Sequence, residues 1–366
     1  MKKEALQMKA LIGMSGGVDS SVAALLMQQA GFDCIGATMR LYSAASEDGS
    51  KTCCSLDDVE DARSVARRLG IAHYVFNFKD AFREQVMDKF ASAYLGGLTP
   101  NPCIDCNRYL KFGALLQRAT ELGCDYVVSG HYARIERDEA TGRYLLKRAA
   151  DRVKDQTYFL YCLNQEQLSR IRFPLGDLTK TQVREIAQEH GFVNARKHDS
   201  QDICFVPGGD YTEFLTGYTG KTFPQGDFLD LQGTPVGRHR GTVCYTIGQR
   251  KGLGLAMGAP VYVCGKDMQR NTVTVGPNEA LFSRGLRAND WFWFPFPALD
   301  APMRVTAKIR HSQFDKPATV YPEEGGFARV IFEEPQRAIS PGQAVVLYSG
   351  DTVVGGGTIT EVLQDE

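Results

Sequence analysis

Two cysteines three positions apart form the first stretch of this chain that could do chemistry. They are Cys103 and Cys106, in the sequence TPNPCIDCN at residues 99–107. This spacing fits half of a zinc or iron–sulfur site, a redox pair, or one reactive cysteine with an incidental neighbour. The N-terminus has no apolar segment typical of a signal peptide, so we expect a cytoplasmic protein with reduced cysteines. Reduced cysteines favour metal binding or catalysis over a disulfide framework.

A glycine-rich run, MSGGVDSS at residues 14–21, forms the second candidate site. It follows a predicted strand and opens a predicted helix, which is the context in which such a loop binds phosphate. Gly16 and Gly17 let the backbone approach an anion, and the first N–H groups of the helix point at it. We therefore expect an oligophosphate here, with Asp19 holding a magnesium ion that bridges the phosphates. The structural alternative is a tight strand-to-helix turn that needs only small residues.

This loop is neither a Walker A motif nor a dinucleotide-binding fingerprint, because it lacks a glycine–lysine pair and the G-x-G-x-x-G spacing. It resembles the SGGxDS pyrophosphate loop of the ATP-pyrophosphatase superfamily, whose members form adenylates. Met39 and Gly130 fall at the carboxyl ends of predicted parallel strands, where such sheets bind ligands. His131, beside Gly130, is a further candidate for contact with phosphate. The resemblance implies ATP contacts at Gly13, Met14, Ser15, Gly16, Gly17, Val18, Asp19, Ser20, Met39 and Gly130.

The elements that must position these residues alternate between short apolar runs and amphipathic helices from Lys9 to Tyr132. This alternation predicts βαβ units around a parallel sheet. A hairpin over residues 132–149 is expected next, followed by helices over residues 157–171 and 180–191. Helical periodicity then disappears near residue 220.

Short strands at near-regular spacing from about residue 286 predict a small β-barrel or sandwich. We therefore predict an α/β protein in three parts, and a chain of 366 residues is long enough for several domains. A parallel-sheet catalytic domain of the ATP-pyrophosphatase type covers residues 1–205, a small middle domain residues 206–280, and a C-terminal β-barrel residues 281–366.

Composition limits the partners that this chain can have. The net charge is −1, so any surface for nucleic acid must be a local basic patch. Candidate patches lie at residues 237–241, 248–252 and 308–311. No stretch reaches the roughly 18 apolar residues needed to cross a bilayer, so we expect no membrane association.

Seven motifs along the chain, in a specific order, are similar to those of the bacterial tRNA-specific 2-thiouridylase family. They are SGGVDSSV, TPNPCIDCNRYLKF, SGHYAR, KDQTYFLY, DSQDICFVP, YTIGQRKGLG and ISPGQAVVLYSGDTVVGGGTI. The resemblance spans about Lys9 to Glu361. It implies that ATP activates C2 of the wobble uridine in transfer RNAs for lysine, glutamate and glutamine, and that sulfur then replaces the C2 oxygen. AMP and pyrophosphate are the other products.

The resemblance also implies roles for individual residues. Cys204 carries a persulfide received from a cysteine desulfurase or a sulfur-relay protein. Cys106 attacks this persulfide and is left in a disulfide with Cys204. From its position just ahead of a predicted helix over residues 107–123, we also expect Cys106 to be favoured as a thiolate. The family's contacts with tRNA fall at Asn101, Pro102, Cys103, Lys154, Asp155, Gln156, Arg310 and His311.

One residue departs from the family pattern and leaves alternatives open. Cys103 stands where many members have an aspartate, and a thiol titrates far from a carboxylate. Cys103, Cys106 and Cys204 could instead hold a [4Fe–4S] cluster that carries the sulfur. Zinc is less favoured because Cys53 and Cys54 form no second C-x-x-C pair.

Two other functions are compatible with parts of the sequence. One is a different ATP-pyrophosphatase, such as a synthetase that uses ammonia on a small acid. The other is a tRNA-binding module with a structural metal clip and no ATP consumption.

Overall fold

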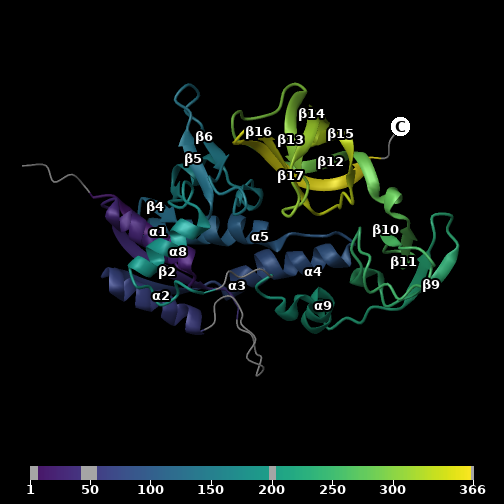
Figure 1. Cartoon of the computed structure of the whole chain (residues 1–366), viewed down its shortest axis with the longest axis horizontal. Helices are drawn as coiled ribbons and strands as arrows, with labels where there is room; N and C mark the ends of the chain where they lie inside the picture. Colours follow the sequence, from purple (N-terminus) through teal and green to yellow (C-terminus); the bar gives the residue numbers. More distant parts are fainter. Residues whose placement is uncertain (1–6, 43–55, 198–202, 364–366) are drawn as a thin grey trace, which may run out of the picture.

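The computed structural model describes residues 7–42, 56–197 and 203–363. Within them the chain forms a parallel-sheet domain, a small mixed domain and a β-barrel (Figure 1), so the predicted fold class is confirmed. Cys53 and Cys54, and the first residues of the DSQDI motif, lie outside the described residues. No described helix is both long enough and apolar enough to span a membrane.

The N-terminal sheet has the strand order β3-β2-β1-β4-β7, with every pair parallel. From β1 the chain moves outward to β2 and β3, and then returns to place β4 on the other side of β1. Ligands bind parallel sheets at such a reversal, outside the carboxyl ends of the strands. The strands are β1 (Lys9–Gly13), β2 (Asp33–Arg40), β3 (Ala72–Asn77), β4 (Tyr126–Val128) and β7 (Ile171–Arg172).

The helices of this part cover the sheet and extend toward the rest of the molecule (Figure 1). They are α1 (Val18–Gln29), α2 (Leu56–Leu69), α3 (Lys79–Phe82), π-helical η1 (Arg83–Met87), α4 (Asp88–Leu95), α5 (Pro102–Asp105), π-helical η2 (Cys106–Ala114), α6 (Leu115–Glu121), the 3₁₀ turn η3 (Thr157–Phe159), α7 (Gln165–Ser169) and α8 (Lys180–Glu189).

The prediction of helical structure over residues 157–171 is confirmed only in part. The segment forms η3, α7 and then β7, and Asn164 begins α7 with a capping box that separates it from η3. Residues 160–163 are all buried, so their apolar side chains face protein in every direction. A single amphipathic helix would bury only one stripe of its surface.

The middle part pairs its strands in the order β10-β11-β8-β9, with β8 and β11 parallel. Its elements are the 3₁₀ turn η4 (Pro207–Gly209), α9 (Tyr211–Thr219), β8 (Gly226–Leu229), β9 (Pro235–His239), the 3₁₀ turn η5 (Thr242–Cys244), β10 (Tyr262–Asp267), β11 (Thr272–Gly276) and the 3₁₀ turn η6 (Asn278–Leu281).

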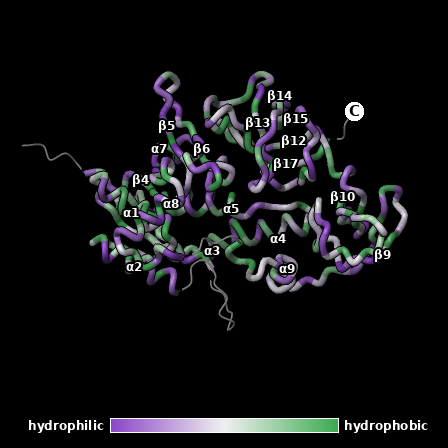
Figure 2. The backbone as a smooth tube through the Cα atoms, viewed as in Figure 1, coloured by the Kyte–Doolittle hydropathy of each residue, from purple (hydrophilic) through white to green (hydrophobic). Residues whose placement is uncertain are grey.

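The C-terminal strands close into a six-stranded barrel, because β12 pairs with both β15 and β17. Buried residues alternate with more exposed ones over the first residues of β12 and β15, whereas Ala344–Tyr348 of β16 and Val353–Gly357 of β17 are continuously buried. Figure 2 shows hydrophobic and hydrophilic stretches mixed throughout this barrel. Closure removes free sheet edges. The elements are β12 (Phe282–Trp293), β13 (Met303–Lys308), β14 (Lys316–Pro322), the 3₁₀ turn η7 (Glu324–Gly326), β15 (Ala328–Arg337), β16 (Ala344–Ser349) and β17 (Thr352–Leu363).

The predicted hairpin is present as β5 (Ala133–Arg137) and β6 (Tyr144–Arg148), but it does not belong to the parallel sheet. Its strand β6 pairs with β17 and so extends the barrel sheet (Figure 1). The parallel-sheet domain and the barrel are therefore joined through main-chain hydrogen bonds.

A second joint links the loop before α5 to the loop between β15 and β16. The Thr99 N–H donates to Pro341 O at 2.9 Å, and Gln343 Nε2 donates to Thr99 O at 2.8 Å. Gly342 has a φ of +90°, and a Cβ there would lie 2.9 Å from both Leu98 Cβ and Thr99 N. Only glycine lets the two loops approach this closely.

Replacing Gly342 by alanine should therefore open this joint. We expect Gly342→Ala to lower the free energy of unfolding by about 2 kcal/mol, because positive φ and a backbone collision act together. Gly350→Ala is the matched control, since Gly350 has a φ of +58° and open space around it. Gly350→Ala should lower the free energy of unfolding by about 1 kcal/mol, from the positive φ alone. Equal losses in urea unfolding would contradict the proposed collision.

Candidate functional site

The glycine-rich loop lies between β1 and α1, at the reversal of the sheet. Gly16 has a φ of +74°, and a Cβ there would approach Asp58 O to 2.3 Å. Gly17 begins α1 in an extended conformation and provides no side-chain cap. The first N–H groups of α1 are thus not capped by Gly17, which is the arrangement that binds an anion at a helix start.

Hydroxyl groups hold this loop in shape. Ser20 Oγ accepts from the Ser15 N–H at 3.2 Å and donates to Gly17 O at 2.9 Å, and Ser21 Oγ donates to the same carbonyl at 3.1 Å. Met14 is buried, and its carbonyl accepts from Thr38 Oγ1 at 2.7 Å. The Gly17 and Met14 carbonyls and the Ser15 N–H are therefore occupied inside the protein, so a phosphate would be bound by the N–H groups at the start of α1.

Other sequence-predicted nucleotide contacts surround the loop. Gly130, after β4, packs directly on the first turn of α1, because a Cβ there would lie 2.7 Å from Ser20 N. Val18 is buried under the loop, and Gly13 ends β1 beside β4. Met39 lies near the carboxyl end of β2. The structure thus brings these residues to one edge of the sheet.

Asp19 has two partners that the sequence did not reveal. Lys180 Nζ donates to its two carboxylate oxygens at 2.7 and 2.8 Å, and the Tyr132 hydroxyl donates at 2.9 Å. Lys180 is buried in the first turn of α8, where the helix dipole disfavours a cation. A lysine in the first turn of a predicted helix is the sequence signal that could have identified Lys180.

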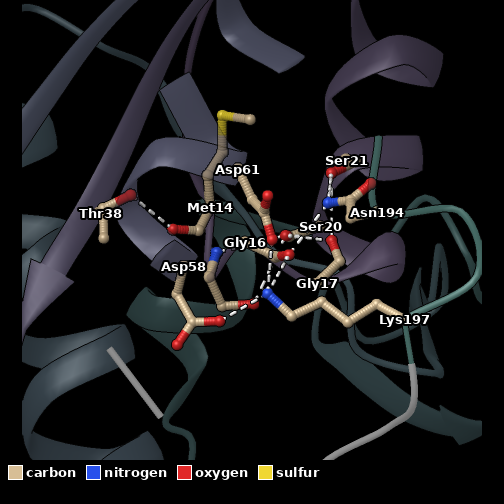
Figure 3. Close-up of polar contacts among 11 residues, drawn as sticks. Met14, Gly16, Gly17, Ser20, Ser21, Thr38, Asp58, Asp61, Asn194 and Lys197 are labelled. Carbon is tan, nitrogen blue, oxygen red and sulfur yellow. Dashed lines mark hydrogen bonds and ion pairs between the residues drawn. The ribbon is translucent and has the colours of Figure 1, made fainter. Parts of the chain in front are cut away.

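A second lysine, Lys197 in the segment after α8, contacts the glycine-rich loop (Figure 3). Lys197 Nζ lies 2.6 Å from Asp58 Oδ1, 2.6 Å from Asp61 Oδ2 and 3.3 Å from Gly16 O. Burial lowers the pKa of Lys197, but its hydrogen bonds with the two aspartates outweigh burial and raise that pKa above its ordinary value. Lys197 is therefore a cation shared by two carboxylates beside the loop, and its charge offsets part of theirs.

Asn194, in the same segment, supports the same carbonyl. Its Nδ2 donates to Gly16 O at 3.0 Å and to Ser21 Oγ at 2.9 Å (Figure 3). Asn194 is buried. Neither Asn194 nor Lys197 belongs to a short motif, and only folding places them at a loop almost 180 residues earlier in the chain.

His131 is built into the core behind the loop. It is buried, its Nδ1 lies 2.7 Å from Ser129 Oγ, and its ring packs against Phe112 and Phe173. Burial lowers the pKa of His131 well below its ordinary value. His131 is therefore neutral near pH 7 and cannot act as a cation toward phosphate.

The expectation that Cys106 precedes a helix is wrong. Helical structure begins at Pro102, whose missing N–H suits the first position, and Asn101 Oδ1 accepts from the Cys103 N–H at 3.2 Å. Cys106 is buried one turn further in, whereas Cys103 is exposed in the first turn. The dipole argument therefore applies to Cys103 more than to Cys106.

Cys106 and Cys204 are far apart in sequence but share one apolar core. Cys106 belongs to it, and half-buried Cys204 packs against it. Phe205, next to Cys204, is held edge-on against Phe82 and Phe90. None of the eight described cysteines is in a disulfide.

The three thiols of the proposed iron–sulfur mount are not assembled in this conformation. Among the described residues, which include Cys103, Cys106 and Cys204, no group of three or more histidine, cysteine, aspartate or glutamate side chains is placed to hold a metal ion. The residues as arranged here therefore do not fit a cluster held by three thiolates.

Three of the eight predicted tRNA contacts, Asn101, Arg310 and His311, line a cavity of about 290 Å³ between the first domain and the barrel. Asn101 and Thr99 line one side, and Arg310, His311, Ser312 and Gln343 line the other. Arg310 also donates to Ser340 Oγ at 2.7 Å and to Ile247 O at 3.2 Å, so its guanidinium connects the barrel with the middle domain. Thr99, Ser312 and Gln343 were not predicted from sequence.

The turn after β6 contains three more predicted tRNA contacts, which differ in how far they are buried: Lys154, Asp155 and Gln156. Asp155 is buried, and its carboxylate accepts from the Ala149 N–H at 2.8 Å. Gln156 Oε1 accepts from the Tyr132 N–H at 2.9 Å. These two side chains shape the turn, while Lys154 is half-buried at its surface.

A second cavity, of about 350 Å³, lies within the middle domain. Its lining includes Arg238, Arg240 and Gly252, so two of the basic segments predicted from sequence meet there. His239 is buried beneath them, with Nδ1 accepting from the Gly241 N–H and Nε2 donating to Asn271 O. The arginines, and not the histidine, provide its positive charge.

Lys197 gives the first prediction for the site. Lys197→Met would leave Asp58 and Asp61 uncompensated beside a bound triphosphate, so we expect the KM for ATP to rise on the order of tenfold. ATP–pyrophosphate exchange measures this. Lys197→Arg should restore most of the affinity. Lys9→Met, which removes an exposed 3.7 Å pair with Asp33, is the control without effect. An unchanged KM in Lys197→Met would refute the charge-balance role.

Asp105 gives the second prediction. Burial raises the pKa of this carboxyl from 3.8 to about 6, against the opposing influence of Lys89 and Arg108. The folded protein therefore binds this proton more tightly than the unfolded chain does, so stability falls as the pH rises from about 4 to 6. Asp105→Asn should stabilise the protein by about 2 kcal/mol at pH 7.5 and leave it unchanged at pH 4. Denaturant unfolding at both pH values measures the difference, and equal effects would contradict the shift.

Comparison with known proteins places the chain in a family. The family model described as "tRNA methyl transferase HUP domain" matches residues 8–208, "tRNA methyl transferase PRC-barrel domain" residues 212–277, and "Aminomethyltransferase beta-barrel domain" residues 283–359. A solved 4-thiouridine synthetase–RNA complex with bound ATP aligns with a TM-score of 0.35 and 19% identity, covering 57% of this chain and 50% of that one. That likeness is too low to support an argument about the site.

Curated relatives match over nearly their full length. The tRNA-specific 2-thiouridylase MnmA of Heliobacterium modesticaldum is 51% identical over 96% of this chain and 92% of that protein. MnmA of Acetivibrio thermocellus is 50% identical over 96% of this chain and 99% of that protein. MnmA of Moorella thermoacetica is 51% identical over 97% of this chain and 100% of that protein. The resemblance predicted from the motifs is confirmed, and the chain belongs to the tRNA-specific 2-thiouridylase family.

Proposed function

We propose that this chain is a cytoplasmic enzyme that replaces the C2 oxygen of the wobble uridine with sulfur in transfer RNAs for lysine, glutamate and glutamine. The observation that carries the proposal is the cavity where Asn101 faces Arg310 and His311. This cavity adjoins the helix start that bears Cys103 and Cys106. Family membership, with about 50% identity over the whole chain, supports the same reaction.

The first half of the proposed reaction makes the base reactive. A uridine C2 carbonyl is a poor electrophile, so its oxygen attacks the α-phosphorus of ATP, pyrophosphate leaves, and AMP becomes the new leaving group. The phosphate loop provides N–H groups for the polyphosphate, and Lys180 and Lys197 offset the nearby carboxylates. A magnesium ion held by Asp19 would share that carboxylate with Lys180, which contacts both of its oxygens in this structure, and the ion would neutralise part of the phosphate charge.

The wobble base must leave the stacked anticodon loop for C2 to be reached. The 290 Å³ cavity provides polar groups for an extruded base, with Asn101, Arg310 and His311 among them. Pro102 and Cys103 begin the helix beside it, and the turn of Lys154, Asp155 and Gln156 approaches from the hairpin side. The arginines of the middle-domain cavity would contact tRNA phosphates.

The second half of the proposed reaction supplies sulfur. Cys204 accepts a persulfide from a cysteine desulfurase or a sulfur-relay protein. The Cys106 thiolate attacks the Cys204 sulfur, which forms the Cys106–Cys204 disulfide and releases hydrosulfide. Hydrosulfide adds to C2 and expels AMP, and an external dithiol then reduces the disulfide. Family membership supports this pairing, and Cys106 belongs to the large apolar core against which Cys204 packs.

The test is sulfur incorporation by the whole chain. The protein is incubated with ATP, magnesium, lysine tRNA, a cysteine desulfurase and cysteine, and the nucleosides are analysed by mass. We expect 2-thiouridine from the wild type and at least a hundredfold less from Cys106→Ser or Cys204→Ser. Cys264→Ser, a half-buried cysteine of the middle domain, is the control that keeps activity.

Full product from either Cys106→Ser or Cys204→Ser would refute the persulfide mechanism. Iron and sulfide analysis of anaerobically purified protein addresses the cluster alternative. Activity that depends on iron would replace the persulfide mechanism with cluster chemistry, whereas iron-free, active protein supports the persulfide.

A further inference from the structure

Two apolar side chains beside the base-binding cavity are more exposed than any other large hydrophobic residue of the described chain. Phe314 is 90% exposed and Val153 is 88% exposed. Phe314 lies in the loop between β13 and β14, and Val153 lies in the turn after β6. Single exposed apolar residues are common on proteins. The two extreme cases, however, lie on two loops that meet at one place.

These two loops are fastened to each other. Arg148, at the end of β6, pairs with Asp315 at 2.9 Å, and Asp315 also accepts a hydrogen bond from Thr306. On the other side of Phe314, the His311 ring packs against Phe159 with centroids 4.4 Å apart. The loop is therefore anchored on both sides of Phe314, while the Phe314 ring itself remains in solvent.

The position of this loop indicates a nucleic-acid partner. His311 and Ser312 line the proposed base cavity, and Phe314 follows two residues later. Lys154 follows Val153, and Lys316 follows Asp315, so cations flank both exposed side chains. A base extruded from an anticodon loop leaves its neighbours without one stacking partner. Exposed aromatic rings with flanking cations are the usual platform for unpaired bases.

We propose that Phe314 stacks on an unpaired anticodon-loop base next to the base that enters the cavity, and that Val153 extends this contact. The proposal rests on the proposed function, because it takes the partner to be tRNA with an extruded uridine. It assigns Phe314 to substrate binding, with no part in adenylation or sulfur transfer.

The test measures binding of an anticodon stem-loop RNA to the full chain without ATP. We expect Phe314→Ala to bind about tenfold more weakly, and Phe314→Trp to retain affinity and lose fluorescence as RNA is added. Tyr74→Ala is the matched control, because Tyr74 is an exposed aromatic residue on edge strand β3. It should bind like the wild type.

Stem-loops with an abasic nucleotide on either side of the target uridine identify the contact. Wild type should bind one of these abasic RNAs about tenfold more weakly than it binds the intact stem-loop. Phe314→Ala should bind that abasic RNA as well as it binds the intact one, as expected when Phe314 and the missing base are partners in one interaction. Equal binding by wild type and Phe314→Ala, or additive losses with both abasic RNAs, would overturn the proposal.

Unchanged RNA binding with slower sulfur loading from the desulfurase would also overturn it, and would assign the surface to a protein donor. These outcomes are independent of the proposed function, whose failure is the absence of 2-thiouridine from the wild type.

Discussion

Charge balance around the glycine-rich loop is the constraint on which the nucleotide site depends. Three carboxylates, from Asp19, Asp58 and Asp61, lie beside a loop that must accept a polyanion. Lys180 pairs with Asp19 and Lys197 with both Asp58 and Asp61, at 2.6–2.8 Å, so two cations offset most of this negative charge. Without these cations, the carboxylates would repel a triphosphate through a partly desolvated environment.

This constraint explains the path of the chain after β7. Helix α8 brings Lys180 to the first turn of α1, and the segment that follows brings Asn194 and Lys197 behind Gly16. The same segment then leads toward Cys204, seven residues beyond Lys197. The part of the chain that completes the nucleotide site is therefore continuous with the part that carries a proposed reactive thiol.

The barrel is as much a part of the site as the parallel sheet. Main-chain pairing of β6 with β17, and the close contact of Gly342 with the loop before α5, hold the barrel against the first domain. The cavity lined by Asn101 and Arg310 lies where these two parts meet. Thr99 and Gln343 belong to the second joint and also line the cavity, so the proposed base-binding site and the joint share these residues.

The sequence alone was sufficient to predict a site where the reactive residues and the backbone conformation that they need lie within one short stretch. The run of Gly16 and Gly17 between a strand and a helix specified the phosphate loop, and the motifs around Cys106 and Cys204 specified the family. Periodicity also predicted the parallel sheet and the C-terminal strands, because alternation and amphipathicity are local properties. It failed over residues 160–163, which are buried and lie between the short helical elements η3 and α7.

Contacts across long sequence separations were decided only by the tertiary structure. From the sequence, Lys197 would be expected to be an ordinary surface lysine. No residue near it in the sequence indicates that Asp58 and Gly16 are its partners. The helix starts at Pro102, five residues earlier than the predicted start at residue 107, and this changed which thiol lies in the first turn. The physical reason is the same in both cases: sequence encodes local preference, whereas packing selects which distant groups share a buried or charged environment.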